Sequence, residues 1–267
     1  MSQALTDTYG NYHNEMERTF DSIRRQATQL QEDIPNMVRD IQPQGEEIVK
    51  AVKSTSKVTG PQRVVVEVFA WSSVMVMATT VGSILGAYIL GPFVSLFFGK
   101  FLASLLAFFI IPVASHAIIR NRERHFESDN KIRTSMLVTS ITQGVLAGYA
   151  INSYYLSSQP LACVTPAVVS VGYTISVRQS HGNRFQMLGF SLGAAFIVNL
   201  VLGAMFGTNT LSYQFLTLGY VAIAGFMMQL VLHDVQMTRG HAYQNALASL
   251  YLLFKGATFY CFGTYIE

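Results

Sequence analysis

Long apolar runs alternate with short polar segments along most of this chain. The runs lie at residues 64–90, 93–119, 134–156, 161–178, 185–206, 212–233 and 243–264. Each is near the ~20 residues that a helix needs to cross the hydrocarbon core of a bilayer. Helices are expected because an open sheet edge cannot satisfy its backbone groups in lipid. The pattern predicts an all-α polytopic membrane protein with a seven-transmembrane-helix bundle over residues 64–267.

A polar arm, residues 1–63, precedes the first apolar run. Apolar residues there recur at alternating steps of four and three, the pattern of one face of an amphipathic helix. They are Met16, Phe20, Ile23, Ala27, Leu30 and Ile34, and Pro35 ends the pattern. A second polar helix is expected over residues 46–57. Whether the apolar face lies on a bilayer, on the protein's own loops or in a coiled coil stays open.

Composition supports the division into an arm and a membrane domain. The chain is 51% hydrophobic and only 12% charged, too little polar surface for a soluble body of 267 residues. Residues 1–63 hold eight of the 18 Lys and Arg residues and nine of the 15 Asp and Glu residues. The lipid bilayer is therefore the first expected partner. The net charge of +3 does not indicate nucleic acid, because the basic residues sit in short clusters at the ends of apolar runs.

Basic residues mark one side of the expected membrane. They lie before the first run and in the loops after the second, fourth and sixth runs, where the main representatives are Arg63, Arg120, Arg122, Arg124, Lys131, Arg133, Arg178, Arg184 and Arg239. By the positive-inside rule the N-terminus is cytoplasmic and the C-terminus lies on the opposite side. A re-entrant seventh segment is the alternative.

Small and polar residues inside the runs predict how the helices pack. Glycines recur at a spacing of four, which lets helix backbones approach closely: Gly82 and Gly86, Gly144 and Gly148, Gly189 and Gly193, Gly203 and Gly207. Packing within one chain is favoured, and a homo-oligomer stays open. The polar residues inside the runs could bond between helices or line a wet cavity: Gln143, Asn152, Asn199 and Gln229. Cys163 and Cys261 are either free thiols or a disulfide.

No pattern of a soluble enzyme is present in the sequence. It has no glycine-rich phosphate loop after a strand, no spaced Cys/His quartet and no HExxH motif. His233 and His241 are too loosely spaced to indicate a metal pair. We therefore expect no catalytic site, no cofactor and no metal centre.

Three ionisable residues near the apolar runs are candidates for function. Glu67 lies one turn inside the first run, where it can pair with Arg63. Lys255 is near the middle of the seventh run, so it either faces a polar cavity or shows that this segment does not cross fully. Asp234 is the only carboxylate between Asp129 and Glu267. It lies within expected reach of Arg120, Arg178 or Arg239, in a structural salt bridge or in a gate.

The end of the chain resembles the transmembrane Bax-inhibitor-motif family, which includes the lifeguard proteins. The resemblance rests on His233-Asp234-Val235-Gln236, on Ala242-Tyr243-Gln244-Asn245-Ala246 and on Leu250-Tyr251-Leu252. It extends over about residues 58–264. It implies a seven-helix bundle in the endoplasmic reticulum or another endomembrane, regulation of cell death (apoptosis) and a pH-sensitive calcium leak. In that mechanism two aspartates share a proton and, with an Arg from the second helix, close the cytoplasmic mouth.

One position departs from the family pattern. Asp234 matches the first aspartate, but Leu253 stands where the second is expected, so a two-carboxylate proton sensor is missing. The first hypothesis is a calcium-permeable leak with weakened pH sensing, in which Ca²⁺ is the permeant ion and the pathway or gate involves Asp234, Arg120 and Lys255. The second is a non-conducting membrane scaffold that binds membrane-bound death-regulating or calcium-handling proteins.

Overall fold

The computed structural model describes residues 49–51, 62–180, 182–233 and 240–265. The chain divides into two units, Met1–Lys53 and Ser54–Glu267, and the helical body is the second. The amphipathic helix expected from Met16 to Ile34 and most of the second polar helix lie outside the described residues, and so does the chain just before the expected arm boundary at residue 63. These expectations stay predictions.

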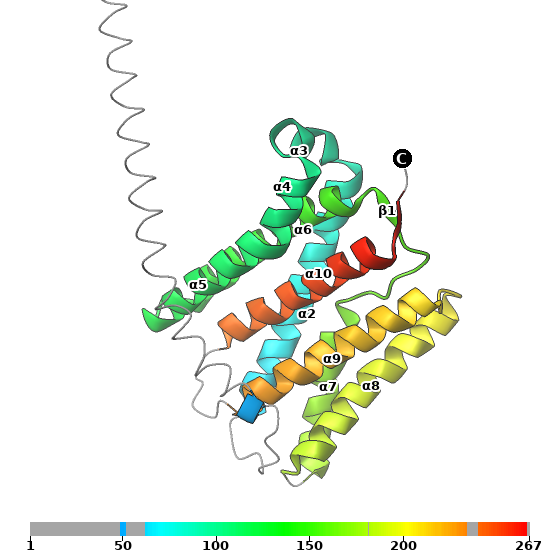
Figure 1. Cartoon of the computed structure of the whole chain (residues 1–267). Helices are drawn as coiled ribbons and strands as arrows, with labels where there is room; N and C mark the ends of the chain where they lie inside the picture. The colour runs from blue at the N-terminus through cyan, green and yellow to red at the C-terminus, as the bar shows by residue number, and fades with distance from the viewer. Residues whose placement is uncertain (1–48, 52–61, 181, 234–239, 266–267) are drawn as a thin grey trace, which may run out of the picture. The chain divides into compact units, whose positions relative to one another are not determined.

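The described part of the second unit is built almost entirely of helices (Figure 1). They are α2 (Gln62–Tyr88), α3 (Gly91–Phe97), α4 (Lys100–Leu105), the π-helix η1 (Leu106–Ile110), α5 (Ile111–Arg124), α6 (Asp129–Ile151), α7 (Val164–Gln179), α8 (Arg184–Met205), α9 (Leu211–His233) and α10 (His241–Phe262). Two short strands, β1 (Tyr154–Tyr155) and β2 (Thr264–Tyr265), pair antiparallel. The predicted all-helical class is confirmed.

The predicted seven membrane spans are not supported. Among the described helices, four are long and apolar enough to cross a membrane: Arg63–Tyr88, Lys100–Arg124, Arg184–Met205 and Leu211–His233. The other three expected spans fail for different reasons. Helix α7 has only 16 residues, and the apolar part of α6 is interrupted by Thr, Ser and Gln side chains. Helix α10 carries Gln244, Asn245 and Lys255 along its length, and each of them lowers its hydropathy.

Helices α2 and α6 pack closely through two of the predicted glycine pairs. A Cβ atom built on Gly86 would lie 2.0 Å from the Val145 carbonyl oxygen, and one on Gly148 would lie 2.0 Å from that of Ser83. Gly82 and Gly144 meet the opposite backbone at similarly short range. Any side chain at these positions would force the two helices apart. The glycine spacing therefore correctly indicated helix packing within the chain for these two pairs, whereas Gly189, Gly193 and Gly207 meet nothing within 4 Å.

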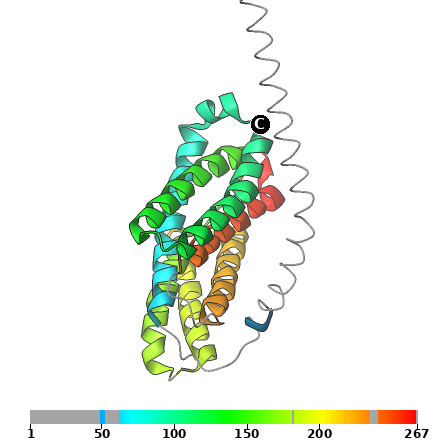
Figure 2. The same cartoon turned by 90° about the vertical axis from the view of Figure 1, so that its left-hand side faces the viewer.

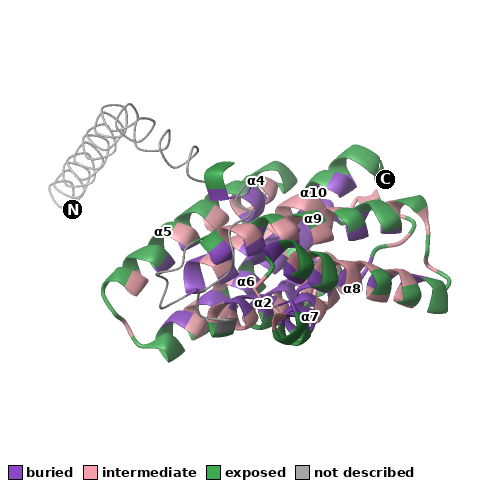
Figure 3. Ribbon diagram, turned by 90° about the horizontal axis from the view of Figure 1, so that it is seen from below, coloured by how far each residue is buried: buried purple, intermediate pink, exposed green. Residues whose placement is uncertain are grey.

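Helix α10 occupies the middle of the bundle. It lies between α5 and α9 in both views of Figures 1 and 2, and it also packs against α2 and α6. The rings of Tyr251 and Tyr220 stack with their centres 4.8 Å apart, and the Tyr251 hydroxyl donates to the Tyr220 carbonyl at 2.9 Å. Both tyrosines are almost completely buried. Buried residues gather where the helices meet, whereas exposed residues cover the outer faces of α5 and α8 (Figure 3).

Two of the predicted polar residues bond between helices. The Gln143 amide on α6 donates to the Ala107 carbonyl of η1 at 3.0 Å. In the π-helical register this carbonyl would accept from residue 112, but Pro112 has no N–H, so the Gln143 side chain supplies a donor. The Asn199 amide on α8 donates to the Thr165 hydroxyl at 3.1 Å. Gln143 and Asn199 therefore form hydrogen bonds between helices, which was one of the two roles expected for them.

Candidate functional site

Most of the charged residues of the body that the structure describes gather at one end of the bundle. This charged end comprises the first turns of α2, α6 and α10 and the last turns of α5 and α7. The carboxylates that the structure describes all lie here: Glu67, Glu123, Glu127 and Asp129. The opposite end, which we call the far end, comprises α3, residues 152–163, the α8–α9 turn and the two strands.

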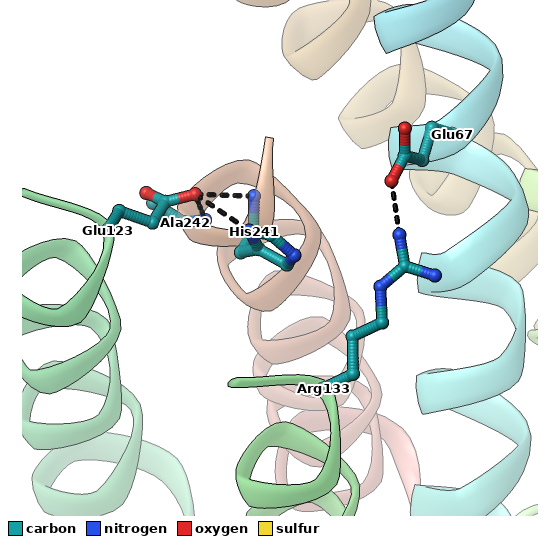
Figure 4. Close-up of polar contacts among 5 residues, drawn as sticks. All are labelled: Glu67, Glu123, Arg133, His241 and Ala242. Atoms are coloured by element: carbon teal, nitrogen blue, oxygen red, sulfur yellow. Dashed lines mark hydrogen bonds and ion pairs between the residues drawn. The ribbon is translucent and has the colours of Figure 1, made fainter. Parts of the chain in front are cut away.

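The Glu123 carboxylate, in the last turn of α5, caps the N-terminus of α10 (Figure 4). One oxygen of Glu123 accepts from the backbone N–H of His241 at 2.8 Å and from that of Ala242 at 3.4 Å, and it lies 3.1 Å from His241 Nδ1. The first N–H groups of a helix have no partner within the helix, and the helix dipole favours an anion there. Glu123 therefore fixes the end of α5 to the beginning of the central helix. Both side chains are largely removed from solvent, with 13% of Glu123 and 2% of His241 exposed.

A second contact joins α2 to α6 at the same end. Arg133 Nη2 pairs with Glu67 Oε1, and the Arg133 guanidinium carbon lies 4.8 Å from the centre of the Trp71 ring (Figure 4). The sequence pointed to Arg63 as the partner of Glu67, one helical turn away. The observed partner comes instead from the parallel helix α6, which the glycine packing brings alongside α2.

The expected gating residues are only partly described. Asp234 and Arg239 lie outside the described residues, so contacts between Asp234 and any arginine stay predictions. Arg120 is exposed on α5, and Arg178 is exposed in the last turn of α7. Leu253, expected at the place of a family aspartate, is half-buried and packs against the apolar cluster of η1 and α6.

Positive charge predominates on the surface of the charged end. The carboxylate of Glu67 pairs with Arg133, that of Glu123 accepts from the start of α10, and that of Glu127 lies 3.5 Å from Arg122. Five basic side chains are exposed there and pair with no carboxylate among the described residues: Arg63, Arg120, Arg124, Lys131 and Arg178. Such a surface suits an acidic partner rather than a cation.

Lys255 lies apart from this end, in a cleft of about 350 Å³ between α2, α6, α10 and residues 152–162. Lys255 therefore faces a partly polar cavity, and α10 is also not among the four helices apolar enough to cross a membrane. Asn152 lines the same cleft. Cys163 and Cys261 are both free thiols, and burial raises the pKa of the Cys163 thiol.

A comparison with known protein families identifies the chain. The sequence pattern of the family described as Interactor of ZYG-11 matches residues 2–265. The chain belongs to this family. Searches among curated proteins and among solved structures returned no match. The match covers both the polar arm and the helical body, so membership is a property of nearly the whole chain.

Membership in this family overturns the resemblance to the Bax-inhibitor family. The expected functions that came with that resemblance, control of cell death and a calcium leak, are wrong on the same ground. The misleading residues have a structural explanation. Tyr251 and the leucines beside it belong to the packed face of α10, where aromatic and aliphatic side chains fill the space between helices whatever the family.

The contact between Glu123 and His241 was not predicted from the sequence. The two residues are 118 residues apart, and no short motif links them. Two weak signals were present. Glu123 is the only acid among the arginines of its turn, and Gly240 precedes a run with helical periodicity, which marks a helix start in need of a cap.

Proposed function

We propose that this chain is a membrane-embedded interaction protein that binds a protein partner of the ZYG-11 kind through its charged end. The observation that carries the proposal is the family match over residues 2–265. The proposal keeps the scaffold hypothesis drawn from the sequence and replaces its death-regulating or calcium-handling partners.

The outer faces of the helices support embedding in a membrane. Large apolar side chains are exposed on α2, α5 and α8, including Val81, Val113 and Ile197, each more than half exposed. A soluble monomer rarely exposes so much contiguous apolar surface. Segments that contain these three helices, and α9 as a fourth, have the length and hydropathy to cross a bilayer. By the positive-inside rule the charged end faces the cytoplasm.

The charged end offers a rigid surface to a partner. Glu123 and the Glu67–Arg133 pair hold the ends of four helices, α5, α10, α2 and α6. The exposed basic residues around them are carried on these fixed helix ends and on α7. A preorganised surface loses less entropy on binding, and its net positive charge speeds the approach of an acidic partner.

A binding experiment with one matched pair of variants tests the proposal. The full chain, purified in a neutral detergent, is titrated with purified ZYG-11. Arg124→Glu reverses one exposed charge at the charged end, and Lys100→Glu makes the same change in charge at the exposed far end. We expect Arg124→Glu to weaken binding about tenfold and Lys100→Glu to change it less than about twofold.

Two results contradict the proposal. Absence of wild-type binding removes the partner assignment. If the two variants change the affinity equally, the charged end is not the binding surface, although ZYG-11 is still the partner.

A further inference from the structure

The cleft around Lys255 lies in the far half of the bundle, away from the proposed partner surface. Its inner part is lined by Thr80, Ser83, the buried Tyr220 and Lys255. Its outer part is lined by apolar side chains of α2, Ile84 and Tyr88. A volume of about 350 Å³ lies at the lower end of the range for small-molecule sites, ~300–1,000 Å³.

Lys255 has no anionic partner among the described residues. Every carboxylate that the structure describes lies at the charged end, and the only other cation described in the far half is Lys100, which bonds to the Ser153 hydroxyl next to the cleft. The ammonium of Lys255 instead lies 5.8 Å from the centre of the Phe259 ring. Lys255 is half-buried, and an ammonium removed from water is destabilised unless an anion or several polar groups surround it. The same charge repels cations, so the cleft is suited to an anion.

An apolar stripe leads from the cleft along the outside of α2. Its members recur at alternating steps of three and four: Val74, Met77, Val81, Ile84 and Tyr88. All are exposed, from 42% for Val74 to 83% for Tyr88, and the last two also form the wall of the cleft. The cleft thus has polar side chains around a cation, and it continues into an apolar surface on the outside of α2. This combination suits a molecule that has an acidic head and a hydrocarbon tail.

We propose that the Lys255 cleft binds an amphiphilic anion, with the acidic head at the Lys255 ammonium and the acyl tail along the α2 stripe. The head is a carboxylate, as in a free fatty acid, or a phosphate, as in a single-chain phospholipid. The two share the recognition by Lys255 and by the hydroxyl-bearing side chains of the cleft. The site is independent of the partner surface, because the two lie in opposite halves of the body.

Binding of defined probes to the full chain in a neutral detergent tests the site. The probes are oleate, lysophosphatidic acid, oleyl alcohol as an uncharged match, and inorganic phosphate as a head without a tail. We expect oleate or lysophosphatidic acid to bind at least about tenfold more tightly than oleyl alcohol, and phosphate not to compete at millimolar concentration. The tighter of the two acidic probes identifies the head. The Lys255→Met variant should reduce its binding to the level of the alcohol, and Lys255→Arg should retain most of it.

Three results overturn the proposal: equal binding of the alcohol and both acids, competition by phosphate at the affinity of the amphiphiles, or unchanged acid binding by Lys255→Met. A measurement on the wild-type chain avoids dependence on a variant that fails to fold. Amine labelling followed by mass spectrometry compares Lys255 with the exposed Lys100. The acidic amphiphile should slow labelling of Lys255 severalfold and leave Lys100 unchanged, whereas equal labelling of Lys255 with and without it contradicts the site.

Discussion

Removing the Glu123 carboxylate should destabilise the body through the start of its central helix. Glu123→Ala deletes the acceptor for the His241 and Ala242 N–H groups in a site where only 13% of the glutamate side chain is exposed. Hydrogen bonds to a charged group contribute about 1.5–3 kcal/mol, and an anion at a partly buried helix N-terminus adds up to about 2 kcal/mol. The two contributions overlap, and the contact to Ala242 is long. We therefore expect a loss of about 2–3 kcal/mol.

Thermal unfolding of the full chain in detergent measures this loss. For a body of this size each kcal/mol lowers the Tm by about 2–4 °C, so the expected shift is about 4–12 °C. The chain has a single tryptophan, Trp71, which lies against Arg133 at the charged end, so its fluorescence reports on the region that changes.

Glu127→Ala is the matched control. Glu127 lies in the same turn region and pairs with Arg122, but both side chains of that pair are more than a third exposed, and such pairs contribute about 0–1 kcal/mol. Glu123→Gln, which keeps an acceptor and removes the charge, should fall between Glu123→Ala and the wild type. If Glu123→Ala and Glu127→Ala shift the Tm equally, the cap on α10 does not contribute as argued.

The other predictions concern helix packing. Gly86→Ala should lower the Tm by more than 5 °C or prevent folding, because the new methyl group would lie 2.0 Å from the Val145 carbonyl oxygen. The control is Gly189→Ala, whose methyl group meets nothing within 4 Å, so it should leave the Tm unchanged or raise it through the better helix propensity of alanine. Equal effects of the two variants on the Tm would contradict the α2–α6 packing. Gln143→Leu should destabilise the body by about 1–3 kcal/mol, since it leaves the buried Ala107 carbonyl without its side-chain donor. Thermal unfolding in the same detergent measures this loss of stability as a lower Tm. An unchanged Tm would mean that the hydrogen bond from Gln143 to the Ala107 carbonyl is not formed.

Much of the fold could be predicted from the apolar pattern, because six of the seven apolar runs each coincide with one helix to within about five residues. The run at 93–119 is the exception, since it holds α3, α4, η1 and most of α5. The number of membrane spans could not be predicted from this pattern. Helix α10 shows why: its Gln244 and Asn245 are buried against neighbouring helices, where Asn245 donates to the Ser115 hydroxyl at 3.0 Å. A hydropathy run records that a segment is apolar on average, and it does not distinguish a helix that faces lipid from one enclosed by protein.

The candidate site was predictable only where its signal is local. The basic clusters pointed to one charged end, and the lone cation of the last run pointed to a polar cavity around Lys255. The contacts of Glu123 with His241 and of Arg133 with Glu67 join residues 118 and 66 positions apart, so they depend on the packing of whole helices. The family assignment failed because short aromatic and aliphatic motifs are shared by many packed helices.

The central claim is that this member of the Interactor of ZYG-11 family binds its partner electrostatically through the charged end. Its most direct test is the affinity of the full chain for purified ZYG-11 at about 0.05 M and about 0.5 M salt, between which the Debye length falls severalfold. We expect saturable binding by the wild-type chain that weakens at least about tenfold at the higher salt concentration. The Arg124→Glu variant should bind weakly even at the lower salt concentration. Binding that is absent, or that is equally tight at both salt concentrations and in the variant, would contradict the central claim.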